Sequence, residues 1–195
     1  NRWFRRRELN FNEYSVWNAD GDHLVNGGNV NGSAASVNNW EAGGGFNVNA
    51  GTLNDRETRG GPMMWFDNFN VFWSWVNTDN RKRLSANVFN GGGSNGHGSH
   101  FHDHEFTVTY RPVTALTATG GMRFNRAENH DQWTDLVTDT TDHYVFGHLS
   151  QTTVALTARL NYTMSPTLSL QLYGEPFVSG GAYTDFREAI DPRNQ

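Results

Sequence analysis

The clearest pattern in the chain is an alternation of apolar and polar residues with a period of two. Between Thr152 and Met164, one set of alternate positions is apolar after its first member, and the other set is mostly polar and includes one charge. Successive side chains of a β-strand point to opposite faces, so the segment is predicted to be a strand with one apolar and one polar face. The same alternation recurs in the segments 42–51, 68–75, 84–88, 106–111, 116–125 and 168–175.

The spacing of these segments predicts about nine strands that follow one another in antiparallel hairpins. We expect short connections near residues 37–40, 77–81, 111–113 and 164–167. Longer connections, rich in Gly, Asn, Asp and His, are expected near residues 55–64, 91–103 and 127–142 and after residue 179. Alternating short and long connections indicate an up-and-down sheet with all of its short turns on one rim.

Two architectures fit this pattern. One is a soluble antiparallel sheet with apolar residues inside, and the other is an outer-membrane barrel with apolar residues outside. The polar positions favour the barrel because they hold Thr, Asn, Gln, Ser and scattered Arg rather than Lys and Glu. Trp40, Tyr110 and Tyr162 fall beside short turns, where one aromatic girdle of a membrane barrel would lie. We therefore predict an all-β fold, part of an antiparallel up-and-down transmembrane β-barrel.

Composition narrows the function classes. The 195-residue chain has a formal charge of −5, no cysteine and a single lysine, Lys82. It contains no basic stripe, which argues against nucleic acid as a partner. The lack of cysteine removes disulfides and thiolate zinc sites. Neither a nucleophile elbow nor a Ser-His-Asp order is recognisable, so we do not expect an enzyme.

The C-terminal segment 143–193 resembles a known outer-membrane family. The motifs that carry this resemblance are Tyr144-Val145-Phe146, Leu149-Ser150-Gln151-Thr152-Thr153, Arg159-Leu160-Asn161-Tyr162-Thr163, Leu168-Ser169-Leu170-Gln171-Leu172-Tyr173, Pro176-Phe177, Gly180, Tyr183 and Phe186. The loop Asp55-Arg56-Glu57-Thr58-Arg59-Gly60-Gly61-Pro62-Met63 resembles a second hallmark of that family.

In that family a β-barrel of unknown function follows an N-terminal carbohydrate-binding module. The resemblance implies a Gram-negative outer-membrane location and a link to glycans, and it supplies no catalytic residue. It further implies that residues 1–195 are either one β-barrel domain or the C-terminal segment of a larger barrel.

Three groups of residues are candidates for a site. Polar positions on the strands are expected to face the lumen of a barrel; they are Arg111, Arg123, Arg159, Asn161, Gln171, Tyr173 and Glu175. The loop Arg59-Gly60-Gly61-Pro62 is expected to fold inward, with Arg59 paired to a lumen carboxylate, or else to form a flexible tip. Neutral imidazoles at His100, His102 and His104 would share one face of an extended segment and could bind a divalent metal such as zinc, copper or nickel. Alternatively, this segment is a His-rich external loop.

Aromatic residues on the strands have two interpretations. The pattern of 68–75 places Phe69, Val71, Trp73 and Trp75 on the apolar face, with Phe72 as the exception. One interpretation places four aromatic residues toward lipid or in a girdle: Trp65, Trp73, Trp75 and Tyr110. The alternative is that they stack on sugar rings.

The function expected from these features is a pore, a transport protein or a structural protein of the outer membrane. Its partners would be outer-membrane lipid, including lipopolysaccharide, with glycans or other membrane subunits as further candidates. One alternative is a soluble all-β binding module for glycan or metal, and another is a structural subunit of a larger membrane assembly. We expect no cofactor other than the metal that the histidines could hold.

Overall fold

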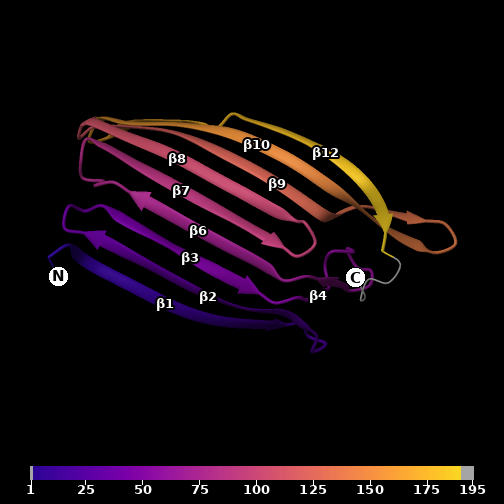
Figure 1. Cartoon of the computed structure of the whole chain (residues 1–195). Coiled ribbons are helices and arrows are strands. Elements are labelled where there is room, and N and C mark those ends of the chain that lie inside the picture. The colour runs from indigo at the N-terminus through magenta and orange to yellow at the C-terminus, as the bar shows by residue number, and fades with distance from the viewer. Residues whose placement is uncertain (1, 190–195) are drawn as a thin grey trace.

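The computed structural model describes residues 2–189, and within them the protein is all β (Figure 1). The strands in chain order are β1 (Phe4–Trp17), β2 (His23–Ser36), β3 (Glu41–Asn49), β4 (Thr52–Asn54), β5 (Met64–Phe66), β6 (Phe69–Asn77), β7 (Leu84–Asn95), β8 (His100–Val113), β9 (Leu116–Thr138), β10 (Asp142–Ser165), β11 (Leu168–Gly174) and β12 (Phe177–Glu188).

Ten of these strands form one antiparallel sheet in the order β1-β2-β3-β6-β7-β8-β9-β10-β11. The tenth, β12, pairs with the other half of β10, so β11 and β12 together occupy the ninth position across the sheet. Each neighbouring pair is a hairpin, apart from the crossing from β3 to β6, which carries the separate β4-β5 hairpin. The predicted all-β antiparallel arrangement is therefore confirmed, with ten strands in the main sheet where about nine were predicted.

The sheet is open rather than closed. Within residues 2–189, β1 pairs with β2 alone, and no pairing joins β1 to β11 or β12. A closed barrel is thus not found. The sheet is nevertheless strongly curved, with β1 at one edge and the C-terminal strands bent away from its plane at the other (Figure 1).

Three of the long connections expected from the sequence are largely strand instead, one of them the segment after residue 179, where β12 runs to Glu188. Residues 127–138 continue β9 and pair with β10, which leaves residues 139–141 as the turn. Gly91, Gly92 and Gly93 belong to β7 and are buried. Phe69 and Phe101 lie over Gly93, so aromatic side chains from the neighbouring strands cover the glycine backbone and hold it in the sheet.

The register divides the sheet into an apolar and a polar face. Phe11, Val30, Phe46 and Phe72 are paired successively across β1, β2, β3 and β6, and all four lie on the apolar face. Along β6 and β10, residues of the polar face are less exposed than those of the apolar face. This difference is expected if the polar face lies on the inner side of the curvature.

Packing against the glycines of β3 should make that strand sensitive to small substitutions. A Cβ atom on Gly45 would lie 2.5 Å from the indole of Trp73 and 2.8 Å from Cβ of Asn31. We expect Gly45→Ala to lower the free energy of unfolding by about 1–3 kcal/mol, the usual cost of overpacking. Gly180→Ala is the matched control, because no atom lies within 4 Å of its added Cβ. Urea unfolding followed by tryptophan fluorescence measures both; equal effects would contradict the described packing.

Candidate functional site

The polar face carries the residues that the sequence predicted for a lumen. Arg159 is paired with Tyr173 across β10 and β11, and its guanidinium lies 5.0 Å from the centre of that ring. Asn161 is paired with Gln171 on the same face. The Tyr173 hydroxyl donates a hydrogen bond to Glu175, which places Glu175 beside this group.

Arg111 lies near the short-turn end of the same face. Its Nη1 donates a hydrogen bond to the backbone carbonyl of Asn80 at 3.2 Å. Together with Glu41, Asn77 and Asn87, it lines a polar hollow of about 420 Å³. The polar face therefore extends to the rim of the sheet with hydrogen-bonding side chains still accessible.

Arg123 forms an ion pair with Asp103 on this face. Its Nε donates to Oδ1 of Asp103 at 2.9 Å, and its Nη2 donates to Oδ2, so the pair is bidentate. Asp103 is only 8% exposed, whereas more than half of the Arg123 side chain is exposed. The sequence analysis did not predict this ion pair. The alternation of His102, Asp103 and His104 along β8 could have shown that the carboxylate lies on the opposite face.

Asparagines form a second polar group, on β1, β2 and β3, which the sequence analysis did not identify. Asn10 donates to Asn31 at 3.0 Å, and Asn12 donates to Asn29 at 2.8 Å. Tyr14 adds a hydrogen bond to Asn49 at 2.6 Å. Asn at alternate positions in three neighbouring strands was the signal that could have predicted this uncharged ladder.

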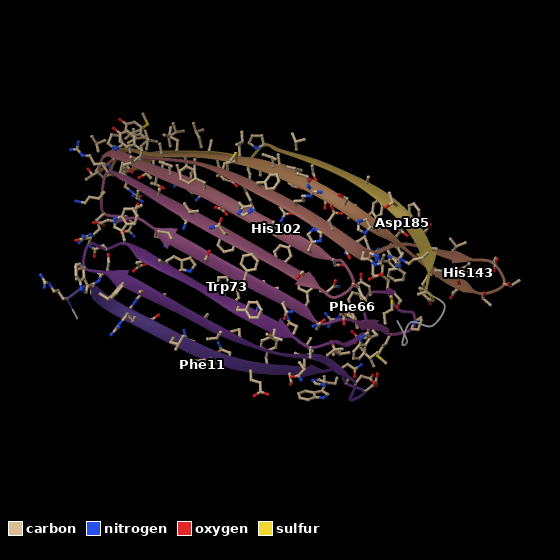
Figure 2. The ribbon with its side chains drawn as sticks, in the orientation of Figure 1. Phe11, Phe66, Trp73, His102, His143 and Asp185 are labelled. Carbon is tan, nitrogen blue, oxygen red and sulfur yellow. The ribbon has the colours of Figure 1, made fainter. Side chains whose placement is uncertain are left out.

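The predicted orientation of β6 is wrong. Trp73 is paired with Gly45 and Trp75 with Gly43 on the polar face, while Phe72 lies on the apolar face beside Phe46. Figure 2 shows Trp73 over the middle of the sheet. The indoles occupy the space above the two glycines, where any larger residue would collide with them. The glycines of β3 therefore allow the tryptophans to be accommodated on the polar side.

The loop motif predicted to fold inward contacts a distant part of the sheet. Residues 55–63, which we call the strap, join β4 to β5. The Arg59 guanidinium lies 3.8 Å from the ring centre of Trp133 in β9, and Gly61 lies against the ring of Tyr144 in β10. Arg59 makes this cation–π contact, and its charge also acts on the carboxyl of Glu57 in the same strap.

Inside the strap, the backbone is fixed by local contacts. Thr58 is 3% exposed, and its hydroxyl donates to the carbonyl of Pro62 at 2.8 Å. Arg59 and Gly60 have φ angles of 53° and 107°, a left-handed turn that glycine tolerates without strain. Arg59, Gly60, Gly61 and Pro62 thus form one defined turn rather than a flexible tip.

Docking of the strap should depend on pH through Glu57. Burial raises the pKa of this carboxyl above its ordinary 4.5; Arg59 opposes the rise, and Asp131 adds to it. Because the pKa of Glu57 is higher when the strap is docked, protonation of Glu57 favours docking. This contribution to docking is fully present below the ordinary pKa, and it is lost as the pH rises through the raised pKa.

We expect a spin label on Arg56→Cys, at an exposed position of the strap, to become more mobile as pH rises through this window. The chain has no other cysteine, so the label is unique. Glu57→Gln should abolish the pH dependence and keep the label restricted. If the change in label mobility with pH persists in Glu57→Gln, another group causes it.

The three histidines lie on one face, as predicted, but they do not form a cluster. His102 and His104 share the apolar face with Phe106 on β8. The rings of His100 and His102 are 6.0 Å apart, and Nδ1 of His104 lies 3.0 Å from the Asn90 amide oxygen. Across residues 2–189, no three His, Asp or Glu side chains are close enough to hold a metal ion. The metal site therefore stays a prediction without an assembled set of ligands.

Further polar residues lie in line with these histidines. Glu128 is paired with His100 and Ser150 in the register, on the same face and at the end of the sheet away from the short turns. Its carboxylate accepts hydrogen bonds from Ser150 at 2.9 Å and from Arg126 at 3.3 Å, and it lies 3.0 Å from His148. The apolar face is therefore bordered by a polar belt on β8, β9 and β10.

Comparisons with known proteins add a family but no function. Among the described residues, no helix is long and apolar enough to span a membrane. Neither the search of curated proteins nor the search of solved structures found a match. The model of one family, described as a domain of unknown function, matches residues 1–192, which is nearly the whole chain. The chain belongs to this family, DUF5916.

Proposed function

We propose that the chain forms part of the wall of a β-barrel in a Gram-negative outer membrane. Its polar face would line a path for solutes, and its apolar face would contact lipid. The proposed role is porin-like transport, with no catalysis by this chain. The link to glycans implied by the sequence resemblance stays a prediction.

The observation that carries the proposal is the course of the apolar band across the sheet. Phe11, Val30, Phe46 and Phe72 belong to one row of paired residues. The same row continues through Gly92, His102, Arg126 and Thr152, where it is no longer apolar.

Toward the C-terminus the apolar residues move to rows nearer the short turns. Leu84, Tyr110, Ala118, Leu160 and Leu172 form one of these rows, across β7 to β11. The band therefore runs obliquely to the rows. Strands of a membrane barrel are tilted by roughly 35–45°, so a band parallel to the bilayer must shift from row to row in this way.

Exposure of the band supports lipid contact. Phe11, Phe106 and Leu156 are 73%, 48% and 51% exposed, with no second layer of described residues over them. Large exposed apolar surfaces of this kind mark contacts with a membrane or another protein. Trp40, Tyr110 and Tyr162 are also exposed, and they lie at the short-turn end, as a girdle requires.

The polar belt, at the end of the sheet away from the short turns, supports lipopolysaccharide as the predicted partner. Arg126, Glu128 and His148 lie where headgroups would meet the outer surface of the barrel. In this place Arg126 would donate hydrogen bonds to phosphate groups and Glu128 would accept them from sugar hydroxyls, and both groups are polar parts of lipopolysaccharide.

Open edges favour a second element of the proposal, association with further strands. Within residues 2–189, β1 and the β11-β12 pair each use one side only for backbone hydrogen bonds. Unpaired backbone groups are not tolerated in hydrocarbon. Additional strands, either of the same protein or of other membrane subunits, would have to complete the wall.

The test combines membrane fractionation with conductance of the full-length protein in planar lipid bilayers. The proposal expects recovery in the outer membrane, a folded gel band that shifts on boiling, and discrete conductance steps. A detergent-free protein in the soluble fraction would instead support the binding module. Outer-membrane recovery without any conductance would support a structural subunit.

A further inference from the structure

Two tryptophans of the polar face lean across the sheet onto the neighbouring strand. The indole of Trp73 in β6 covers Gly45 of β3, and the indole of Trp75 covers Gly43. Both tryptophans are half-buried, so part of each ring surface stays accessible from the polar side. Figure 2 shows Trp73 over the middle of the sheet, away from both rims. Aromatic surface is therefore present on the face that the proposed function assigns to water.

Phenylalanines extend this aromatic surface along the strands. The rings of Phe69 in β6 and Phe101 in β8 both lie over Gly93 of β7. Their centres are 6.1 Å apart, and their planes differ by only 8°. A strand rises about 3.3 Å per residue, so the aromatic surface from Phe69 to Trp75 runs for roughly 20 Å along β6. An extended solute could contact several of these rings at once.

The asparagine ladder lies directly beside the indoles. Asn10, Asn31, Gly45 and Trp73 are paired in succession across β1, β2, β3 and β6, so they form one row of the polar face. Asn10 donates to Asn31 at 3.0 Å, and Asn31 donates to Asn29 at 2.8 Å. Each amide has two N–H donors and an oxygen with two lone pairs, so these contacts leave further hydrogen-bonding capacity.

This part of the polar face is uncharged. On β1, β2, β3 and β6, the described rows from Tyr14 to Asn10 hold no Asp, Glu, Lys, Arg or His on the polar face. The carboxylate of Glu8, the next polar-face residue of β1, lies 3.4 Å from Nε of Arg6. The Asp103 ion pair lies on β8, two strands beyond β6 in the sheet order. The combination of aromatic rings and amides therefore suits an uncharged solute.

We propose that Trp73, Trp75 and the ladder of Asn10, Asn29 and Asn31 bind neutral, unbranched oligosaccharides. A pyranose ring has an apolar C–H face that packs on an aromatic ring, and its hydroxyl groups exchange hydrogen bonds with amides. The inference rests on the proposed function and deepens it, because it names the class of solute that the polar path would take.

The test is isothermal titration calorimetry of the full-length protein in detergent with maltopentaose and with cellopentaose. Current through the protein in planar bilayers is recorded in the same sugar solutions. Both sugars are expected to bind and to interrupt the current. The glucuronic acid counterpart of cellopentaose carries a carboxylate on each ring, and it is expected to bind more weakly because the surface offers no unpaired cation.

Variants separate the two parts of the surface. Trp73→Ala should weaken binding about tenfold, whereas Trp73→Phe keeps an aromatic ring and should retain most of the affinity. Asn10→Ala removes an exposed amide from the edge strand and should weaken binding about fivefold. Trp40→Ala and Asn38→Ala are the matched controls, because both residues lie in the short turn between β2 and β3, and both should bind as the wild type does. Heat-modifiability on a gel shows that each variant is folded.

The outcomes distinguish the binding surface from the pore. If neither neutral pentasaccharide binds the folded wild type, the aromatic rings only cover the glycines and the inference is wrong, whereas discrete conductance steps would still support the pore. Equal weakening by Trp73→Ala and Trp40→Ala would also refute the inference, as would equal affinity for the neutral and the charged chain. Trp73-dependent binding by a protein that never conducts would support the binding surface and refute transport.

Discussion

Leu156→Arg is expected to prevent stable insertion of the protein, whereas Thr157→Arg should insert normally. Leu156 lies within the apolar band of β10, on a face that shows no charge from Val154 to Met164. Arginine on the lipid side of a barrel costs about 2–4 kcal/mol at the midplane of the bilayer. Thr157 is the next residue and lies on the polar face, which would line the water-filled path of the proposed wall.

The measurement is urea unfolding of both variants in lipid vesicles, together with recovery of the boil-sensitive folded band from outer membranes. Placing the same residue at adjacent positions keeps charge and size constant. A large loss for Leu156→Arg with little change for Thr157→Arg supports the assignment of faces. Equal tolerance of both changes would mean that neither face contacts lipid.

Arg123→Gln should produce the second-largest effect because it leaves Asp103 without its cation. The Asp103 carboxylate is nearly buried and receives two hydrogen bonds from that guanidinium. Removing one partner of a fully buried pair costs about 3–5 kcal/mol. Arg123 is more than half exposed, so we expect about 2 kcal/mol after allowing for screening by solvent.

Two variants separate this effect from a general loss of charge. Asp103→Asn combined with Arg123→Gln should recover most of the stability, because no buried charge is then left alone. Arg111→Gln removes an arginine from the same face whose side chain donates a hydrogen bond to the Asn80 carbonyl, and it should change stability by less than about 0.5 kcal/mol. If the double variant is no more stable than Arg123→Gln, the cost does not arise from the pair.

The strands that sequence analysis predicted best are those with strict alternation. In β10 every second residue from Val154 to Met164 is apolar, and the structure pairs them on one face with β9 and β11. The predicted lumen residues Arg123, Arg159 and Asn161 lie on the opposite face for the same reason. The alternation of apolar and polar residues can be read from the local sequence alone, and it was sufficient to assign these positions to a face of the sheet.

Alternation failed where aromatic residues are adjacent. Phe72, Trp73 and Trp75 supply apolar side chains to both faces of β6, so the sequence offers no contrast from which to choose the phase. The choice is made by pairing with β3, where Gly43 and Gly45 leave room for the indoles. Such information depends on a neighbouring strand and is not present in the local pattern.

Glycine-rich and polar segments were the other source of error. Gly91 to Gly93 resemble a loop in composition, but they belong to β7, where aromatic side chains of β6, β7 and β8 lie against them. The strap was recognisable from Arg59-Gly60-Gly61-Pro62, whereas its contact with Trp133 was not. A contact between segments so far apart in the sequence cannot be read from the local pattern.

The most direct test of the central claim is a scan of single cysteines along β10. Cysteine replaces each residue from Thr153 to Leu160 in turn, in a chain that has no native cysteine. A spin label at each position then reports contact with oxygen dissolved in lipid or with a water-soluble nickel complex. The account predicts oxygen contact at positions 154, 156, 158 and 160, and nickel contact at 153, 155, 157 and 159. Nickel contact at both sets of positions would show water on both faces and would contradict the membrane wall.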